Sequence, residues 1–129
     1  MKTAYLLDAL ALLAALFREP GADRVAEVLE RSAISAVNLY EVVTRQIRLG
    51  AKAELAVANL ERLNLPVIPW DEELALAAAD LSPLAVTHGL SLGDRACLAT
   101  ARLRGWTALT ADQDWANLPP LGFPVEIVR

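Results

Sequence analysis

The stretch YLLDALALLAALF, residues 5–17, joins a short apolar segment to a run of nine apolar residues through a single acid. Residues 3–7 are typical of a buried strand. Residues 9–17 are apolar on every face of a helix, so we expect that helix to be buried. A carboxylate at Asp8 costs on the order of several kcal/mol in such surroundings unless something compensates its charge. Asp8 is therefore the first candidate for a functional residue.

Outward from this stretch, helical and strand patterns alternate along the chain. Strands are predicted over residues 32–35, 65–70, 106–110 and 124–128, and a short helix begins at residues 111–115. Longer helices are predicted over residues 22–31, 35–50, 51–63, 71–81, 82–89 and 91–104, with Ser35, Asp71, Ser82 and Ser91 as expected N-caps. The alternation predicts an α/β sandwich with a mostly parallel sheet. We expect residues 1–129 to form one domain.

Composition excludes several classes of protein. The chain is 55% hydrophobic, with one cysteine and one histidine. These numbers exclude an internal disulfide and a Cys/His zinc site, and they favour the cytoplasm as compartment. Nine apolar residues are too few to span a membrane. A net charge of −4 argues against bulk electrostatic binding of nucleic acid.

Four acids are expected at one edge of the sheet. Asp8 and Asp112 follow predicted strands, and ligands of open α/β sheets bind at the carboxyl ends of strands. Glu41 and Asp94 lie on helices that begin near strand ends or turns. Four carboxylates without a histidine suit a hard cation such as Mg²⁺ or Mn²⁺.

Structural explanations stand beside this functional one. Ser91 and Asp94 have the spacing of a capping box. Glu41 has the i, i+4 spacing for an ion pair with Arg45, and Asp112 fits the first turn of the short helix. Asp8 has the weakest structural explanation, because its neighbours are apolar.

Two further features have competing explanations. Arg45, Arg48 and Lys52 fall on one helix face, either as a solvated stripe or as a guide for a phosphate backbone toward Glu41. Cys97 lies among apolar helix positions, which indicates a small core residue.

Four segments together resemble the PIN domain, specifically the VapC-type toxin ribonucleases of toxin–antitoxin pairs: YLLDALALLA, AISAVNLYEVV, LSLGDRACLATA and TALTADQDW. The resemblance implies a three-layer α/β/α sandwich. It places the family's acidic quartet on Asp8, Glu41, Asp94 and Asp112, with Asp114 as an additional metal-binding acid. Asn38 and Thr110 match polar residues that commonly line the family's pocket.

The resemblance also implies an activity and partners. The activity is that of an Mg²⁺- or Mn²⁺-dependent endoribonuclease that cleaves cellular RNA, with tRNA or rRNA as the expected substrate. The implied partners are a cognate VapB-type antitoxin and a second copy of the chain in a homodimer. The apolar faces of the early helices are either antitoxin contacts or simply core, at Leu12, Leu16, Val25, Leu29 and Leu55.

One position departs from the family pattern. The family usually has a Ser or Thr two residues after the first acid, whereas this chain has Leu10 after Asp8. A second hypothesis therefore stays open, in which the chain is a non-catalytic PIN scaffold that binds RNA or an antitoxin. A third is a metal-dependent phosphatase on a similar α/β sheet.

Overall fold

The structure is a computed structural model and describes residues 2–129. Its centre is a five-stranded sheet with the strand order β3-β2-β1-β4-β5. The strands are β1 (Tyr5–Leu7), β2 (Ser32–Ser35), β3 (Val67–Ile68), β4 (Thr107–Thr110) and β5 (Val125–Ile127). All four neighbouring pairs are parallel. The predicted mostly parallel sheet is therefore confirmed, with every described strand in the same direction.

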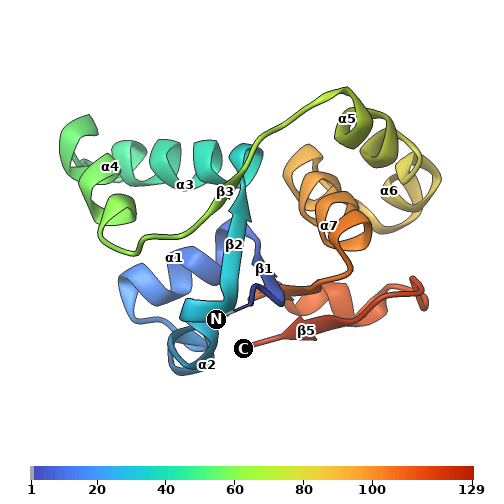
Figure 1. The fold of residues 1–129 in the computed structure, drawn as a ribbon, viewed down its shortest axis with the longest axis horizontal. Coiled ribbons are helices and arrows are strands. Elements are labelled where there is room, and N and C mark those ends of the chain that lie inside the picture. The colour runs from blue at the N-terminus through green and yellow to red at the C-terminus, as the bar shows by residue number, and fades with distance from the viewer. Residues whose placement is uncertain (1) are drawn as a thin grey trace.

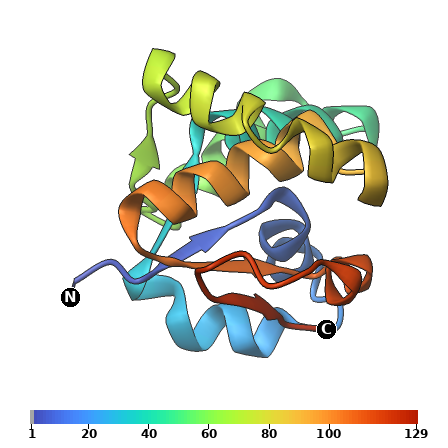
Figure 2. The same ribbon diagram turned by 90° about the vertical axis from the view of Figure 1, so that its right-hand side faces the viewer.

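Helices cover both faces of this sheet (Figure 1). They are α1 (Ala9–Phe17), α2 (Ala22–Val28), α3 (Ala36–Arg48), α4 (Ala53–Glu61), α5 (Glu72–Ala79), α6 (Ser82–His88) and α7 (Leu92–Arg104), with short 3₁₀ turns η1 (Leu29–Arg31) and η2 (Gln113–Asn117). Figure 2 shows α7 and α2 on opposite sides of the strands. This arrangement is the predicted α/β/α sandwich. Within residues 2–129, no helix has the length and apolar content needed to cross a membrane.

Consecutive strand residues supply two separate cores. Leu6 of β1 packs in the cluster that includes α5 and α7, whereas Leu7 packs in the cluster that includes α1 and α3. Ala33 and Ile34 of β2 divide between the two clusters in the same way. Because side chains alternate across a strand, a parallel sheet covered on both faces needs continuous apolar runs. The YLL of β1 and the AI of β2 meet this requirement.

The helix ends follow the predicted caps with one exception. Three expected N-caps accept a backbone N–H in the first turn, namely Ser35, Asp71 and Ser91. The prediction of Ser82 as an N-cap is wrong. Leu81 is the N-cap of α6, and the Ser82 hydroxyl donates to the Ala79 carbonyl instead. The predicted helix over residues 22–31 ends at Val28 and continues as the 3₁₀ turn η1.

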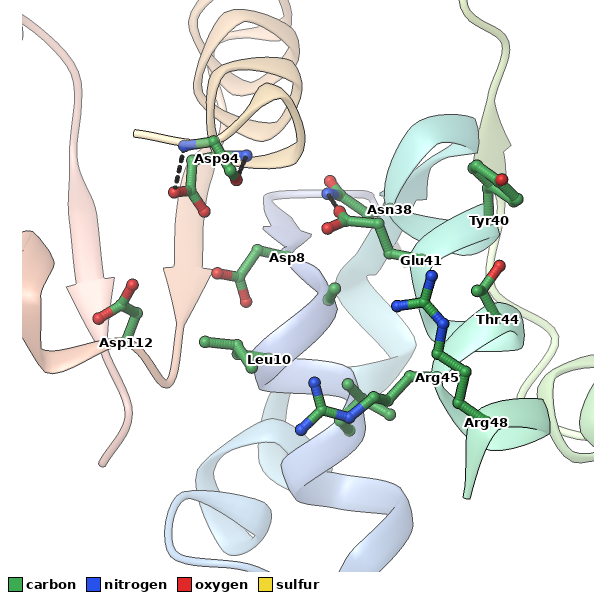
Figure 3. A pocket seen from close by; sticks show the side chains of 13 residues that line it. Asp8, Leu10, Asn38, Tyr40, Glu41, Thr44, Arg45, Arg48, Asp94 and Asp112 are labelled. Atoms are coloured by element: carbon green, nitrogen blue, oxygen red, sulfur yellow. Dashed lines mark hydrogen bonds between the residues drawn. The ribbon is translucent and has the colours of Figure 1, made fainter. Parts of the chain in front are cut away.

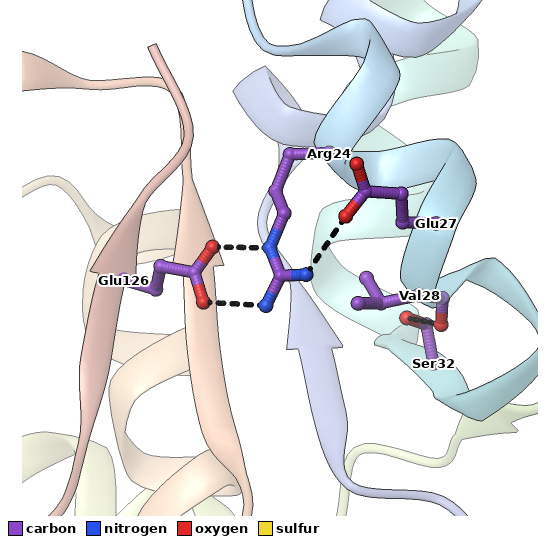
Figure 4. A network of polar contacts seen from close by, with 5 residues as sticks. All are labelled: Arg24, Glu27, Val28, Ser32 and Glu126. Atoms are coloured by element: carbon purple, nitrogen blue, oxygen red, sulfur yellow. Dashed lines mark hydrogen bonds and ion pairs between the residues drawn. The ribbon is translucent and has the colours of Figure 1, made fainter.

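The edge strand β5 is tied to α2 across the molecule (Figure 4). Arg24 Nε and Nη2 donate to the two carboxylate oxygens of Glu126 at 2.7 and 3.0 Å. Such a bidentate pair fixes the relative orientation of the two groups. Nearby, Gly21 begins α2 at φ +102°, where a Cβ atom would lie 2.7 Å from Val128 Cγ2. The chain that follows β5 therefore packs directly on the backbone of Gly21.

This contact predicts a cost for a side chain at residue 21. Gly50 is a matched control, because its φ of +104° is equally strained but its Cβ position is open. We expect Gly21→Ala to lower the free energy of unfolding by about 1 kcal/mol or more beyond Gly50→Ala, since it adds overpacking to the same backbone strain. Urea denaturation of both variants measures the difference. Equal losses would show that Val128 moves away without cost.

Candidate active site

Asp8 lies beside the switch point of the sheet, where the chain stops adding strands on one side of β1 and begins to add them on the other. The chain builds β1, β2 and β3 toward one edge and then returns to add β4 and β5 on the other side of β1. Ligands of open α/β sheets bind at such a switch point, outside the carboxyl ends of the strands. Asp8 follows β1, and Asp112 lies two residues beyond the adjacent β4.

A cavity of about 440 Å³ opens at this edge (Figure 3). Its lining includes the four predicted acids Asp8, Glu41, Asp94 and Asp112, together with Leu10, Asn38, Tyr40, Thr44, Arg45 and Arg48. The structure therefore brings the four acids to one cavity. Asp114 is not in the lining, and its exposed backbone N–H donates to Asp112 Oδ1 at 2.9 Å.

Asp8 is buried at the junction of two strands and a helix. Its side chain is 3% exposed. One carboxylate oxygen accepts the Ala11 N–H at 2.8 Å, which makes Asp8 the N-cap of α1. The other oxygen accepts a hydrogen bond from the Thr110 hydroxyl at the end of β4. This capping role was not predicted from the sequence, although an acid directly before a helical run is its ordinary signal.

The two hydrogen bonds do not fully offset the cost of burying the charge. Burial, together with the negative charges of Asp94 and Asp112, raises the pKa of Asp8 to about 7, even though the hydrogen bonds from Thr110 and Ala11 lower it. Burial also raises the pKa of Asp94. A cation in the cavity would relieve this cost by favouring the ionised forms.

Glu41 is positioned by a contact between α3 and α7. Asn38 Nδ2 donates to Glu41 Oε1 at 2.7 Å and to the Gly93 carbonyl at 3.1 Å. Any Cβ atom on Gly93 would collide with the Glu41 carboxylate. A side chain at residue 93 would therefore displace the Glu41 carboxylate from this position. The alternative of an ion pair with Arg45 is wrong, because no pair within 4.0 Å joins them in the structure.

Asn38 leaves one acceptor free. The side chain is 1% exposed, and its Oδ1 has no hydrogen-bond partner. Both partners of Nδ2 are acceptors, so the orientation of the amide is determined by its contacts. A buried acceptor without a donor costs free energy. Oδ1 thus offers a place for a donor, such as a water molecule, beside the acids.

Asp94 and Asp112 are both held by local backbone contacts. Ser91 N donates to Asp94 Oδ2 at 2.9 Å, and Asp94 N donates to Ser91 Oγ at 3.1 Å. The predicted capping box is therefore present, and Asp94 lines the cavity as well. Asp112 is the N-cap of η2 rather than a residue of its first turn. Its N–H donates to Thr110 Oγ1 at 2.9 Å, so one threonine links it to Asp8.

The opposite wall of the cavity is basic and belongs to α3. Arg45 and Arg48 line it and are exposed, whereas Lys52 lies outside the lining. Sequence reasoning did not single out Tyr40 and Thr44, which also line this wall. The available signal was helical spacing, because Thr44 lies three positions after Glu41 and Tyr40 lies four positions before Thr44.

Several other predicted residues belong to the interior. Cys97 is fully buried in the core, as predicted. Among the candidate antitoxin contacts, Leu12 and Val25 are fully buried core residues. Leu16 and Leu29 are half-buried and line a second cavity of about 680 Å³ between α1 and α2.

A family model covers nearly the whole described fold. The model of the PIN domain matches residues 5–120, which contain all the acids of the cavity. The chain belongs to the PIN domain family. No curated protein matches it significantly.

Solved structures with the same fold include several toxin–antitoxin complexes. A chain of DNA-bound VapBC from Salmonella typhimurium has a TM-score of 0.73 at 19% identity and covers 100% of both chains. The toxin–antitoxin complex from Klebsiella pneumoniae has a TM-score of 0.72 at 21% identity, with 98% of each chain covered. VapBC-5 from Mycobacterium tuberculosis, of the VapBC toxin–antitoxin family, has a TM-score of 0.65 at 26% identity, again with 98% covered. This PIN domain thus has the fold seen in VapBC structures.

PIN domain nucleases generally use divalent metal ions. The charged and amide groups around Asp8 fit such an ion, because the carboxylates and Asn38 Oδ1 are hard oxygen donors. Among residues 2–129, no three His, Cys, Asp or Glu side chains lie close enough together to hold an ion directly. Mg²⁺ usually keeps several waters and takes only one or two protein carboxylates, so this spacing is compatible with it.

The raised pKa of Asp8 predicts a pH-dependent stability of the metal-free protein. Its folded-state pKa of about 7 exceeds the ordinary value of 3.8. The stability from the protonated carboxyl is fully present below pH ~4 and is lost as pH rises through ~7. At about 1.4 kcal/mol per pKa unit, this loss reaches up to about 4 kcal/mol.

Urea denaturation in EDTA at pH 5 and pH 8 measures this loss. Asp8→Asn is the matched variant, because an amide accepts from Ala11 and donates to Thr110 without a charge. We expect it to remove most of the decline between the two pH values, with a smaller remainder from Asp94. An undiminished decline in the variant would show that Asp8 is already ionised at pH 5.

Proposed function

We propose that this PIN domain, residues 1–129, is a VapC-type toxin, a divalent-metal-dependent endoribonuclease. The observation that carries the proposal is the convergence of four carboxylates from separate elements on one cavity at the switch point of the sheet. By the resemblance of the sequence, the family's acidic quartet falls on these residues, and all four lie within the part of the chain that the family model matches. Oxygen donors without histidine favour Mg²⁺ or Mn²⁺ as the ion.

Each acid has a distinct support in this mechanism. Asp8 is held rigidly by Ala11 and Thr110, and Asp94 by its capping box, so both present fixed oxygens to the cavity. Asn38 orients the Glu41 carboxylate through the 2.7 Å hydrogen bond. Asp112 completes the cavity or orients the attacking water. A bound Mg²⁺ or Mn²⁺ lowers the pKa of that water and stabilises the charge that develops on the phosphate.

The family and the similar structures support a proposal for the substrate and the partners. We propose cellular RNA as substrate, with tRNA or rRNA as the first candidates. We propose a VapB-type antitoxin as inhibitor, since the similar structures include VapBC complexes. The cavity between α1 and α2, with the apolar side chains of Leu16, Leu29 and Leu63 in its lining, is a candidate contact for it. A homodimer in the cytoplasm is the expected form of the free toxin.

Cleavage of total tRNA and rRNA by purified protein tests the activity. We expect cuts with Mg²⁺ or Mn²⁺ and none with EDTA. Asp94→Asn should reduce the rate on the order of a hundredfold or more, because metal-assisted charge stabilisation is worth several kcal/mol. The amide still accepts the Ser91 N–H, so the fold is retained.

Asp80→Asn is the matched control, because Asp80 is exposed and lies outside the lining of the cavity. It should cleave like the wild type. Cleavage that persists in EDTA or in Asp94→Asn would contradict the proposed mechanism. The same assay on Asp114→Asn decides whether the fifth predicted acid takes part.

Leu10 favours the second candidate function, a scaffold that binds RNA or antitoxin without cutting. It lines the cavity and is 42% exposed where the family usually has a hydroxyl. We expect Leu10→Ser to raise the cleavage rate about tenfold, since a hydrogen bond to a charged group contributes roughly 1.5–3 kcal/mol.

Leu103→Ser serves as the control, because Leu103 is 45% exposed and lies outside the cavity lining. A wild type that binds RNA without cutting it, together with an active Leu10→Ser variant, would establish the scaffold instead. Equal rates for wild type and Leu10→Ser would show that the chain does not need the hydroxyl.

A further inference from the structure

The basic wall of the cavity consists of three exposed side chains on α3: Tyr40, Arg45 and Arg48. We propose that this wall binds an unpaired RNA strand, with the two arginines on its phosphates and Tyr40 stacked on a base. The inference deepens the proposed nuclease function. It rests on that function only in assuming that the bound strand leads to the acids. What it adds is the assignment of Tyr40, Arg45 and Arg48 as the residues that hold the strand beside the acids.

Charge complementarity supports an anionic occupant. Arg45 and Arg48 form no ion pair within 4.0 Å in the described part of the chain, although the protein carries a net charge of −4. The nearest acid along the helix, Glu41, is engaged by Asn38 instead. Both guanidinium groups thus remain available, and their planar donors match phosphate oxygens.

The arrangement of these cations gives the strand a direction. Glu41, Arg45 and Arg48 follow one another on a single face of α3, over about 10 Å of helix at 1.5 Å per residue. In Figure 3, Arg48 points back along α3 toward Glu41, and Arg45 extends toward Leu10 on α1. A phosphate backbone lying along this face would lead directly to the acids.

Tyr40 supplies an exposed aromatic ring, which a site for phosphate alone would not need. It is the most exposed aromatic residue of the described chain, at 73%, and it lines the cavity beside Thr44. A base stacked on an aromatic ring contributes binding free energy without regard to sequence. In a duplex the base faces are already stacked, so such a ring favours a strand whose bases are unpaired. An aromatic ring that can stack on a base, beside two arginines that can bind phosphates, favours RNA over an acidic peptide.

Fluorescence anisotropy with a labelled, unstructured RNA oligonucleotide tests the surface without requiring cleavage. The protein is titrated in EDTA, which prevents the proposed reaction, and again with the same sequence as a duplex. Exposed positions are substituted, so the fold is retained: Arg45→Ala, Arg48→Ala, Tyr40→Leu and Tyr40→Phe. Arg62→Ala is the matched control, because Arg62 is exposed at the end of α4 and outside the cavity lining.

We expect Tyr40→Leu to weaken binding of the single strand about fivefold or more, and Tyr40→Phe to restore it, because the ring rather than the hydroxyl stacks. Each arginine variant should lower the slope of log affinity against log salt by about 0.7, the value for one phosphate contact on a single strand. Arg62→Ala should bind like the wild type. The duplex should bind more weakly than the strand.

Unchanged affinity in the arginine variants, or a wild type without affinity for the strand, would overturn the proposal. Equal affinity for strand and duplex would overturn the role of Tyr40. Tighter binding of a polyglutamate peptide than of the RNA would assign the wall to an acidic partner and overturn it as well. The expected binding pattern without any metal-dependent cleavage would support this surface while contradicting the proposed nuclease.

Discussion

The carboxylate of Asp8 joins three parts of the molecule that must form together. It ends the central strand β1, caps α1 through the Ala11 N–H, and accepts the Thr110 hydroxyl from β4. Thr110 in turn accepts the N–H of Asp112. The acids that end adjacent strands are thus connected through one hydroxyl. The carboxylate that organises this edge of the sheet is thus also one of the four acids of the cavity.

Electrostatics divides the cavity into two unlike walls. Burial is the main reason why the pKa values of Asp8 and Asp94 are raised, and repulsion between the acids of the cavity adds to it. The arginines of α3 face them without pairing. A cation on one wall and a phosphate on the other would satisfy both, and a phosphodiester with its bound metal ion has this polarity. The burial of Asp8 among apolar residues is understandable in these terms.

The sequence predicted what depends on local patterns. Apolar runs located the strands, and Ser35, Asp71 and Ser91 marked helix starts, because capping involves only neighbours along the chain. Contacts between helices were not predictable in this way. The Asn38 bond to the Gly93 carbonyl depends on how closely α3 approaches α7. The Asn38 bond to Glu41 is local, at i, i+3, but the i, i+4 spacing favoured Arg45 as the partner of Glu41 instead. The exposure of Tyr40 likewise follows from tertiary packing rather than from its own turn of helix.

The side chains at positions 41 and 93, which are 52 positions apart in the chain, compete for the same space. The Glu41 carboxylate occupies the space that a Cβ atom on residue 93 would need. Alanine at residue 93 would therefore be compatible with a shorter acid at residue 41, whose carboxylate would end before the backbone of α7. The volumes of the two side chains are constrained as a sum, so natural variation at these positions should be correlated.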